Sequence, residues 1–470
     1  MPLPVLSIAQ MRAAETATWA TGQTEAEVIR LVGKKIARRV RKFTRAGDTI
    51  LFLVGKGHNG DDARAAAKQL EDRHAQVLEM FLPDTDLLPL ETALQAKPAL
   101  IVDGLFGTGL NRPLSEAWQK IISTLNASQI PVLALDVPSG LNADTGETFG
   151  AAVRAALTLT IGAPKTGLLT AAASPFIGRL EVATDVGLLP FAPTGELLWT
   201  QAEDFVGFPP PRPAAGHKGD FGHVAIIAGS LGYHGAAVLA ARGAQRAQLG
   251  LVTVYPQEEI FHAVAAQLQS TMVSPWRPVL KFPSSVSALL GGPGLVSPEQ
   301  AEEMRINFRH WWRDWEHPFI VDASGLDFLA AEPVARKFIR VLTPHPGEAA
   351  RLLNSTVPKI QADRPKALRE LSRRFGHCWV ILKGQHTLIG RSEGEIYVNS
   401  SGNPHLAQGG SGDLLAGYIS GLLAQPALQS DVAKTLRFAV WQHGAAADHL
   451  QATRANWTVE DLANAIGNAG

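Results

Sequence analysis

Cysteine, net charge and long apolar runs are all scarce in this sequence of 470 residues. The single cysteine, Cys378, excludes a disulfide within the chain, and its apolar neighbours indicate a buried hydrophobic side chain rather than a nucleophile. No run approaches the roughly 18 to 20 apolar residues that a membrane-spanning helix needs. Residues 1–20 lack a basic start followed by an apolar core, so we expect no secretory signal and a cytoplasmic protein.

The chain also has no excess of charge of either sign. Lys and Arg together number 43, as do Asp and Glu, so the formal net charge is zero. Without a global field we expect neither a nucleic-acid polymer nor a membrane surface as a partner, and any anionic ligand must be held by local groups. Hydrophobic residues make up 46% and charged residues 18%, which is typical of a globular protein. The length predicts about two or three domains.

Short apolar runs recur along the chain, each ending in a turn with Gly or Asp and most leading into a helical pattern. They cover residues 50–54, 100–102, 132–135, 224–228, 251–255, 289–290, 319–321 and 380–382. Runs this short and apolar suit strands that are covered on both faces, and helical crossovers between them imply parallel sheets. The sequence therefore predicts α/β architecture.

A proline-rich segment at about residues 190–213 interrupts this pattern, and proline can neither continue a helix nor lie inside a sheet. We therefore predict two α/β domains, residues 1–200 and 201–470. In both, polar and glycine-rich residues follow the strands, where open α/β sheets bind ligands. The tryptophan cluster at residues 311–315 has no such position and indicates helix packing or an oligomer contact.

The strongest motif, residues 402–413, reads Gly-Asn-Pro-His-Leu-Ala-Gln-Gly-Gly-Ser-Gly-Asp and precedes an apolar, helix-like run. Glycines let the backbone approach a phosphate closely, and the N–H groups that open the next helix carry partial positive charge. The motif therefore predicts an anion site. By itself it leaves Asp413 open as a base beside the anion or as a helix cap.

Three further stretches occur in a fixed order before this motif. Residues 217–222 read His-Lys-Gly-Asp-Phe-Gly, residues 343–348 Thr-Pro-His-Pro-Gly-Glu and residues 382–387 Leu-Lys-Gly-Gln-His-Thr. With residues 409–413 they resemble the ADP- or ATP-dependent NAD(P)H-hydrate dehydratases, which have a ribokinase-like fold. The resemblance spans about residues 203–465 and implies a nucleotide cofactor, ADP or ATP.

The resemblance also implies roles for individual residues. The nucleotide would be contacted by Lys383, Gly384, Gln385, His386 and Thr387, and its phosphate by Gly412. The hydrated nicotinamide would be lined by Ala236, Gly294, His345 and Asp413, although the turn at residues 233–236 departs from the family's small-residue sequence. Asp413 would take the proton of the substrate hydroxyl as a general base. Phosphoryl transfer needs positioning and charge neutralisation, so we expect Mg²⁺, with Glu348 as a candidate ligand.

The first half carries its own set of motifs after predicted strands. Residues 55–63 read Gly-Lys-Gly-His-Asn-Gly-Asp-Asp-Ala, residues 103–110 Asp-Gly-Leu-Phe-Gly-Thr-Gly-Leu and residues 136–141 Asp-Val-Pro-Ser-Gly-Leu. Together they resemble the NAD(P)H-hydrate epimerase domain over roughly residues 5–200. This domain is expected to be a Rossmann-like three-layer α/β/α unit, and its fusion to a dehydratase is the arrangement of the bifunctional hydrate-repair enzymes.

This second resemblance implies a potassium ion held by oxygen atoms of Asn59, Asp103 and Ser139. Asp136 would be the acid/base group of the epimerase; without the resemblance, the favoured interpretation is that Asp103 and Asp136 cap the ends of strands. Substrate contacts would come from His58, Asn59, Gly60, Asp61, Asp62, Gly107, Thr108, Gly109, Leu110, Asn111, Arg112, Pro113 and Asp136.

The first loop departs from the family sequence Asn-Asn-Gly-Gly-Asp-Gly. His58, Asp61 and Ala63 replace its first Asn, second Gly and last Gly. Asp61 adds negative charge where a pyrophosphate would approach, which can cost about 1 kcal/mol or more. We therefore hypothesise a weakened epimerase beside an intact dehydratase.

The sequence thus predicts a lyase fused to an isomerase, acting on the hydrates of NADH and NADPH and forming a homo-oligomer. The alternative is a ribokinase-like small-molecule kinase with a non-catalytic N-terminal binding module, because the anion loop of residues 409–413 is shared with sugar kinases. Fold alone does not choose between these activities.

Overall fold

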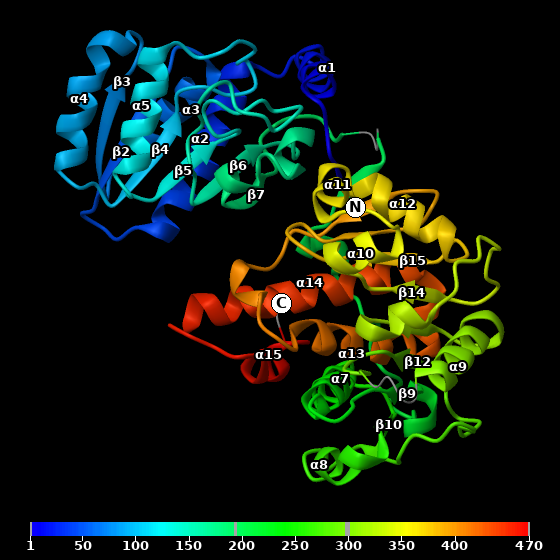
Figure 1. Cartoon of the computed structure of the whole chain (residues 1–470). Helices are drawn as coiled ribbons and strands as arrows, with labels where there is room; N and C mark the ends of the chain where they lie inside the picture. The colour runs from blue at the N-terminus through cyan, green and yellow to red at the C-terminus, as the bar shows by residue number, and fades with distance from the viewer. Residues whose placement is uncertain (1, 192–194, 297–300, 469–470) are drawn as a thin grey trace. The chain divides into compact units, whose positions relative to one another are not determined.

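A computed structural model describes residues 2–191, 195–296 and 301–468. The chain forms two compact units, one of Leu3–Gly195 and one of Glu196–Gly470 with Met1–Pro2 (Figure 1). Each unit is an α/β fold with its own sheet and core. Among the described residues, no helix is long and apolar enough to cross a membrane.

The sheet of the N-terminal unit has the strand order β3-β2-β4-β5-β6-β7, with every neighbouring pair parallel. The strands are β2 (Thr49–Val54), β3 (His74–Glu79), β4 (Leu100–Gly104), β5 (Val132–Leu135), β6 (Leu157–Ile161) and β7 (Arg179–Ala183). The helices are α1 (Ile8–Trp19), α2 (Glu25–Phe43), α3 (His58–Ala67), α4 (Pro83–Gln95), α5 (Glu116–Ala127) and α6 (Ser174–Ile177). The strand order reverses at β2, because β3 lies on one side of it and β4 on the other, and doubly wound sheets bind ligands at such a switch point.

Helices cover both faces of this sheet. Alternate residues of β2 point to opposite faces: Ile50, Phe52 and Val54 join the core under α2 and α3. Leu51 and Leu53 join the core under α4 and α5. All five side chains are fully buried, which explains why β2 reads as an unbroken apolar run.

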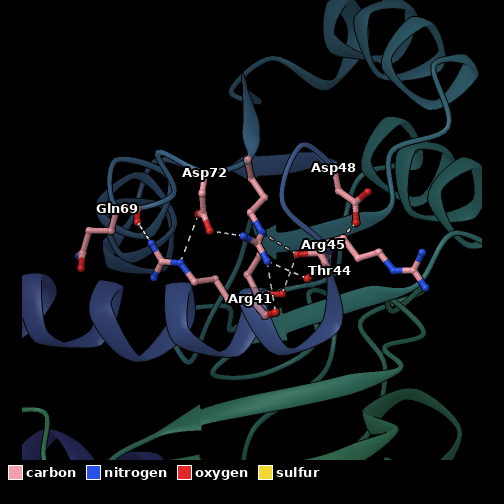
Figure 2. A network of polar contacts seen from close by, with 8 residues as sticks. Arg41, Thr44, Arg45, Asp48, Gln69 and Asp72 are labelled. Carbon is pink, nitrogen blue, oxygen red and sulfur yellow. Dashed lines mark hydrogen bonds and ion pairs between the residues drawn. The ribbon is translucent and has the colours of Figure 1, made fainter.

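A polar network joins the end of α2 to the turns before β2 and β3 (Figure 2). Arg41 lies 3.3 Å from Asp72 and also donates to the carbonyl of Gln69. The N–H of Arg45 donates to Asp48 over 2.6 Å. These contacts lie at the amino ends of the strands, away from the edge where ligands bind, and exposed ion pairs contribute little stability.

The sheet of the C-terminal unit runs β8-β17-β16-β15-β14-β13-β12-β9-β10-β11. The strands are β8 (Leu197–Trp199), β9 (His223–Ile227), β10 (Leu251–Tyr255), β11 (Met272–Val273), β12 (Ala288–Gly291), β13 (Phe319–Val321), β14 (Arg340–Leu342), β15 (Trp379–Leu382), β16 (Leu388–Gly390) and β17 (Ile396–Val398). Most neighbouring strands are parallel, but β16 is antiparallel to β15 and β17. The loop of residues 383–387 is too short for a crossover helix, so the chain turns back as a hairpin.

The helices of this unit lie on both sides of the sheet. They are α7 (His234–Arg246), α8 (Phe261–Ala265), α9 (Ala301–Asp314), α10 (Pro346–Leu352), α11 (Val357–Ala362), α12 (Arg364–Arg374), α13 (Ser411–Leu423), α14 (Val432–Thr453) and α15 (Val459–Ala465). Short 3-10 helices of the chain are Thr166–Leu169, Ala202–Phe205, Lys218–Phe221, Glu258–Ile260, Ala323–Phe328, Pro404–Leu406 and Pro426–Asp431.

Helix α13 packs between α7 and α14, and Figure 1 shows α13 and α14 side by side. Glycines allow the close approach to α7. A Cβ atom on Gly243 would lie 2.1 Å from the carbonyl oxygen of Leu414, and one on Gly417 would lie 1.9 Å from that of Ala240. Because no larger residue fits at either contact, the position of α13, and of any side chain in its first turn, is fixed by backbone contact.

The tryptophan cluster lies at the end of α9. Trp311 and Trp312 are buried, and Trp312 packs on Phe319 of β13 with ring centroids 6.0 Å apart. The buried guanidinium of Arg340 donates to the carbonyl oxygens of Trp312 (2.6 Å) and Trp315 (2.5 Å), which ends the helix. For Trp311 and Trp312 the helix-packing interpretation is therefore correct.

Candidate active sites at the carboxyl edges of the two sheets

Asp413 lies in the first turn of α13, three residues after the N-cap. The N-cap is Gly410, whose φ of 90° is left-handed and favours glycine, and no side chain caps this helix end. The interpretation of Asp413 as a helix cap is therefore wrong. Its carboxylate is instead placed at the carboxyl edge of the sheet.

Three neighbouring strands bring further polar groups to this edge. Lys383 follows β15 and its Nζ lies 2.7 Å from Oδ1 of Asp322, which follows β13. Thr343, after β14, donates to the same oxygen of Asp322 over 2.7 Å. A Cβ atom on Gly412 would lie 3.4 Å from Nζ of Lys383, so the start of α13 meets this group. The structure thus joins Lys383 and Gly412, two predicted nucleotide contacts, to Asp322, which the sequence did not identify.

The pKa of Asp413 is raised to about 6, chiefly because the carboxyl is removed from water. Asp322 and Glu348 raise the pKa further, and the Lys383 ammonium opposes them. Burial by itself lowers the pKa of Lys383, but the carboxylates of Asp322, Glu348 and Asp413 raise it above its usual value. At neutral pH Asp413 is therefore a carboxylate close to its pKa, and it lies beside the charged ammonium of Lys383. Such a carboxylate suits a general base.

His345 and Glu348 form a reciprocal cap at the start of α10. Nδ1 of His345 accepts from the N–H of Gly347 at 3.0 Å and of Glu348 at 3.3 Å. Oε2 of Glu348 accepts from the N–H of His345 at 2.7 Å. These bonds fix the imidazole, whose side chain is 53% exposed and so accessible to a ligand.

Ala236 and Gly294, predicted to line the nicotinamide, are brought together from α7 and from the loop after β12. A Cβ atom on Gly294 would lie 2.8 Å from that of Ala236, and its φ of 64° also favours glycine. Ser230 ties the two loops together by donating to the carbonyl of Gly294 over 2.7 Å. The strands β9, β12 and β13 are parallel neighbours in that order, so the loops that follow β9 and β12 lie along the same edge of the sheet as Asp322.

The remaining predicted nucleotide contacts lie in the loop between β15 and β16. Oγ1 of Thr387 donates to the carbonyl of Gly384 over 2.9 Å. The His386 ring packs on Trp199 with centroids 5.4 Å apart, and burial lowers the pKa of His386 to about 4, so the ring is neutral. Gln385 is exposed. Arg364 of α12 contacts the carbonyl side of this loop and was missed, because nothing in its local sequence distinguishes it from other helical arginines.

In the N-terminal unit, Asp103 at the end of β4 is fully buried and faces Ser139. Its Oδ1 accepts from Oγ of Ser139 at 2.6 Å and its Oδ2 from the N–H of Ser139 at 2.9 Å. Burial raises the pKa of Asp103 to about 6 although these bonds lower it. Nδ2 of Asn59 donates to the carbonyl of Phe106 over 3.0 Å, and Ser139 contacts the same carbonyl. The predicted potassium ligands are therefore gathered around one peptide.

Asp136 follows β5 with a left-handed φ of 60°. Its Oδ1 accepts from the ammonium of Lys165, from the N–H of Ile161 at 3.0 Å and from Oγ1 of Thr160 at 3.2 Å. Lys165 is only 1% exposed and also donates to Thr160 over 3.0 Å. The sequence analysis missed Lys165; a lysine in the glycine-containing turn after the strand at residues 157–161 was the available signal.

Two more acids lie close to this ion pair. Burial, with help from the charges of Asp136, Asp61 and Glu25, raises the pKa of Asp62 to about 8. The carboxyl of Glu15, in α1, also has its pKa raised by burial and by Asp136. Asp62 is therefore mostly protonated at neutral pH while Asp136 is paired with a cation.

The three departures from the family loop have individual partners. Asp61 pairs with Arg64 at 2.8 Å, and His58 lies 2.5 Å from Glu25, all of these side chains being partly or largely exposed. Ala63 is buried in the core, close to Gly104. Gly60 packs tightly on the preceding loop, and Gly107 lies beside the Asn59 side chain. The other predicted substrate contacts are only half-buried or exposed: Thr108, Gly109, Leu110, Asn111, Arg112 and Pro113.

Comparisons with known proteins extend over both units. Residues 224–468 match the family described as NAD(P)H-hydrate dehydratase, and residues 25–93 and 79–167 match the YjeF-related protein N-terminus. A bifunctional NAD(P)H-hydrate repair enzyme of Gloeobacter violaceus is 34% identical over 98% of this chain and 96% of its own length. That of Coxiella burnetii is 33% identical over 93% of each chain.

Solved structures resemble the C-terminal unit. A ribokinase-like superfamily protein of Enterococcus faecalis has 23% identity and a TM-score of 0.50, covering 58% of this chain and 95% of that one, which shows the fold. An ADP/ATP-dependent NAD(P)H-hydrate dehydratase of Bacillus subtilis, co-crystallised with ATP/Mg²⁺, has 29% identity and a TM-score of 0.49 over 55% of this chain and 92% of its own.

These matches confirm the predicted fold class, two α/β units of which the C-terminal one is ribokinase-like. They also confirm the predicted family, in which a lyase and an isomerase are fused. Because full-length relatives above 30% identity match nearly the whole sequence, the chain belongs to the bifunctional NAD(P)H-hydrate repair enzymes.

Proposed function

We propose that this enzyme restores hydrated NADH and NADPH, with dehydration in residues 201–470 and interconversion of the R and S hydrates in residues 1–200. The observation that carries the proposal is the Asp413 group: a carboxylate with a pKa of about 6, at a helix start, beside the Lys383–Asp322 ion pair. A base and a cation at one anion-binding edge suit phosphoryl transfer to an alcohol.

In the dehydratase, Asp413 takes the proton of the substrate hydroxyl while the terminal phosphoryl group of ADP or ATP is transferred to that oxygen. Phosphate is a far better leaving group than hydroxide, so the ring nitrogen can expel it, and loss of a ring proton restores the reduced nicotinamide. Lys383 and the N–H groups at the start of α13 would stabilise charge on the transferred group. Products are NAD(P)H, phosphate and AMP when ADP is the donor.

Mg²⁺ would supply charge neutralisation at the phosphates of the nucleotide, with few ligands from the protein. Among the described residues no cluster of three or more metal-ligating side chains could hold an ion. Both oxygens of Glu348 face His345, which disfavours it as a ligand. Magnesium in nucleotide sites commonly keeps its waters and uses few protein ligands, so the donor set here fits such a site.

In the epimerase, we assign the base to Asp136 and the acid to Asp62. Asp136 takes the hydroxyl proton, the bond between the hydroxyl-bearing carbon and the ring nitrogen opens, and Asp62 protonates the nitrogen. Closure on the other face of the resulting carbonyl returns both protons to where they began. The Lys165 ammonium contacts Asp136, whereas burial raises the pKa of Asp62 to about 8 and keeps that carboxyl protonated at neutral pH. A carboxylate beside a cation and a protonated carboxyl close to it suit the base and the acid of one reaction.

Potassium would be held by Asn59, Asp103 and Ser139. Oδ1 of Asn59 is buried and has no hydrogen-bond partner among the described residues, and the other two side chains contribute oxygens around the same peptide. A buried acceptor without a donor is costly, and a weakly hydrated cation would satisfy it. Bound there, the ion would order the loop that carries Asp62 and so the substrate contacts.

The direct test is incubation with a mixed pool of R and S hydrates plus ADP or ATP, following reduced-cofactor absorbance and phosphate. Complete conversion with one phosphate released per cofactor supports both activities. A plateau near the S fraction supports the dehydratase alone. A stable phosphorylated product without reduced cofactor would instead support the small-molecule kinase and contradict the proposal.

A further inference from the structure

Arg364, the first residue of α12, is buried against the loop that joins β15 and β16. Its guanidinium donates to the carbonyl oxygens of Leu382 (3.0 Å), Lys383 (3.3 Å) and His386 (3.3 Å), and also to that of Gln385. One side chain thus contacts three of the five carbonyls of the loop of residues 383–387, and the carbonyl at the end of β15. The side chain is recruited from 18 to 22 positions earlier in the chain.

This arginine has no carboxylate partner among the residues that the structure describes. It is 9% exposed, and burial lowers its pKa to about 10, so it remains charged at neutral pH. A buried cation is costly unless hydrogen bonds replace its water, and here only loop carbonyls do so. The arrangement therefore couples the charge of Arg364 to the shape of the loop.

The loop needs such support because its backbone is unusual. Gly384 has a φ of 135° and His386, which is not glycine, has a φ of 50°. Left-handed backbone in a non-glycine residue costs roughly 1 kcal/mol or more and persists only where the surroundings enforce it. A Cβ atom on Gly384 would lie 3.2 Å from a guanidinium nitrogen, so the arginine also fills the space beside it.

Peptide geometry fixes what the opposite side of the loop presents. In a trans peptide the C=O and the following N–H point in opposite directions. Because the carbonyls of Lys383, Gln385 and His386 face Arg364, the N–H groups of Gly384, His386 and Thr387 face away from it. In the described part of the chain, none of these three N–H groups donates to a backbone carbonyl.

We propose that Arg364 is a positioning residue of the nucleotide site. By drawing the loop carbonyls to itself, it turns the amides of Gly384, His386 and Thr387 toward acceptor atoms of the bound nucleotide, next to Lys383 and Gly412. The inference rests on the proposed function and deepens it: the loop recognises an anionic nucleotide through backbone amides, and Arg364 makes that surface possible.

The chain offers a matched control on the same helix. Arg369 is 8% exposed and donates to the carbonyls of Arg391 (2.6 Å) and Gly394 (2.5 Å), in the hairpin between β16 and β17. Its removal breaks the same kind of carbonyl contact at the same depth, together with an ion pair of 3.8 Å to the exposed Glu196, away from the amides of residues 384–387. A general loss of stability would therefore follow from either substitution, whereas a loss of nucleotide affinity follows only from Arg364.

The experiment compares Arg364→Met, Arg364→Lys and Arg369→Met with the wild type in the full-length protein. Calorimetric titration with ADP and with ATP gives Kd, steady-state assays give kcat and the KM of each substrate, and thermal unfolding gives Tm. We expect Arg364→Met to raise Kd and KM for the nucleotide at least about tenfold, or ~1.4 kcal/mol. The KM of the hydrate should stay within about twofold, and Arg364→Lys, which keeps the charge without the planar fork, should be intermediate.

Arg369→Met should lower Tm to a similar extent and leave the nucleotide Kd within about twofold. Hydrogen exchange of the peptide spanning residues 382–388 should be faster in Arg364→Met than in Arg369→Met. Two results would overturn the inference: an unchanged nucleotide affinity in Arg364→Lys and Arg364→Met, or an equal loss of affinity in Arg369→Met. In either case, binding of ADP by the wild type would still uphold the proposed function. A folded wild type that binds neither ADP nor ATP would refute both.

Discussion

Replacing Asp413 by Asn should lower the rate of dehydration and raise the stability of the protein. The substitution keeps the size of the side chain and its place in the first turn of α13, but it removes the charge and the ability to accept a proton. A general base typically accelerates a reaction by about 10² to 10⁴. We therefore expect kcat for dehydration to fall by that factor, about 2.7 to 5.5 kcal/mol of transition-state stabilisation, with ADP binding retained.

The stability effect follows from the raised pKa of Asp413. Its folded-state value of about 6 lies roughly two units above the ordinary 3.8, so the folded protein holds this proton more tightly than the unfolded chain does. The destabilising cost is absent below about pH 3.8, grows as the pH rises to about 6, and is complete above it. At one pKa unit per 1.36 kcal/mol it reaches ~3 kcal/mol at neutral pH as an upper bound.

Asp413→Asn removes that cost, so the free energy of unfolding at pH 7.5 should rise by about 1 to 3 kcal/mol, or roughly 2 to 10 °C in Tm. At pH 4 the gain should disappear. In the wild type, dehydration should fall about tenfold per pH unit below pH 6, because protonated Asp413 is no base, and the variant should lack this limb. Thermal unfolding at the two pH values, ADP titration and single-turnover assays measure all three effects. Turnover within tenfold of the wild type, or a lower Tm at pH 7.5, would refute the reasoning.

The remaining predictions concern the N-terminal unit. Lys165→Met leaves the charge of Asp136 buried without its cation and should destabilise the unit by about 3 to 5 kcal/mol in urea unfolding; a loss below ~1 kcal/mol would contradict the assigned pair. The rate of epimerisation should decline above about pH 8 as Asp62 loses its proton, and Asp62→Asn should abolish the activity. An Asp62→Asn variant with an unchanged pH–rate profile would exclude Asp62 as the acid. Exchanging K⁺ for Na⁺ should slow epimerisation by the wild type. The rate of a folded Asn59→Ala variant should be the same in either salt. If Asp61 weakens the epimerase, Asp61→Gly should raise kcat/KM for epimerisation several-fold. Robust epimerisation by the wild type that this substitution does not improve would contradict a weakened epimerase.

The ion pair that Asp61 forms affects how strongly this residue can weaken the epimerase. Its carboxylate pairs with Arg64, so part of the added charge is offset before a pyrophosphate approaches. Both side chains are partly exposed, and such pairs contribute little. The expected gain from Asp61→Gly is therefore several-fold rather than orders of magnitude, and a weakened epimerase stays a prediction.

Much of the fold could be predicted because its strands are buried on both faces. The runs at residues 132–135, 251–255 and 319–321 coincide with β5, β10 and β13 to the residue. The antiparallel β16, Leu388–Gly390, was not predicted. Its direction follows from the length of the loop before it, and the chain can only turn back there.

Local sequence was sufficient where a function depends on neighbouring residues. The glycines before α13, the acid in its first turn and the unusual loop after β15 could all be recognised in place, because backbone approach and helix-terminal charge are properties of a few consecutive residues.

Only the tertiary structure decided which distant groups complete each site. Asp322 meets Lys383 across 61 positions, Lys165 meets Asp136 across 29, and Arg364 reaches a loop that begins 19 residues later. Parallel strands deliver their carboxyl ends to one edge whatever lies between them in sequence, so proximity there is set by strand order. The shifted pKa values of Asp62, Asp103 and Asp413 have the same origin, since burial and charge neighbours exist only once the sheets have assembled.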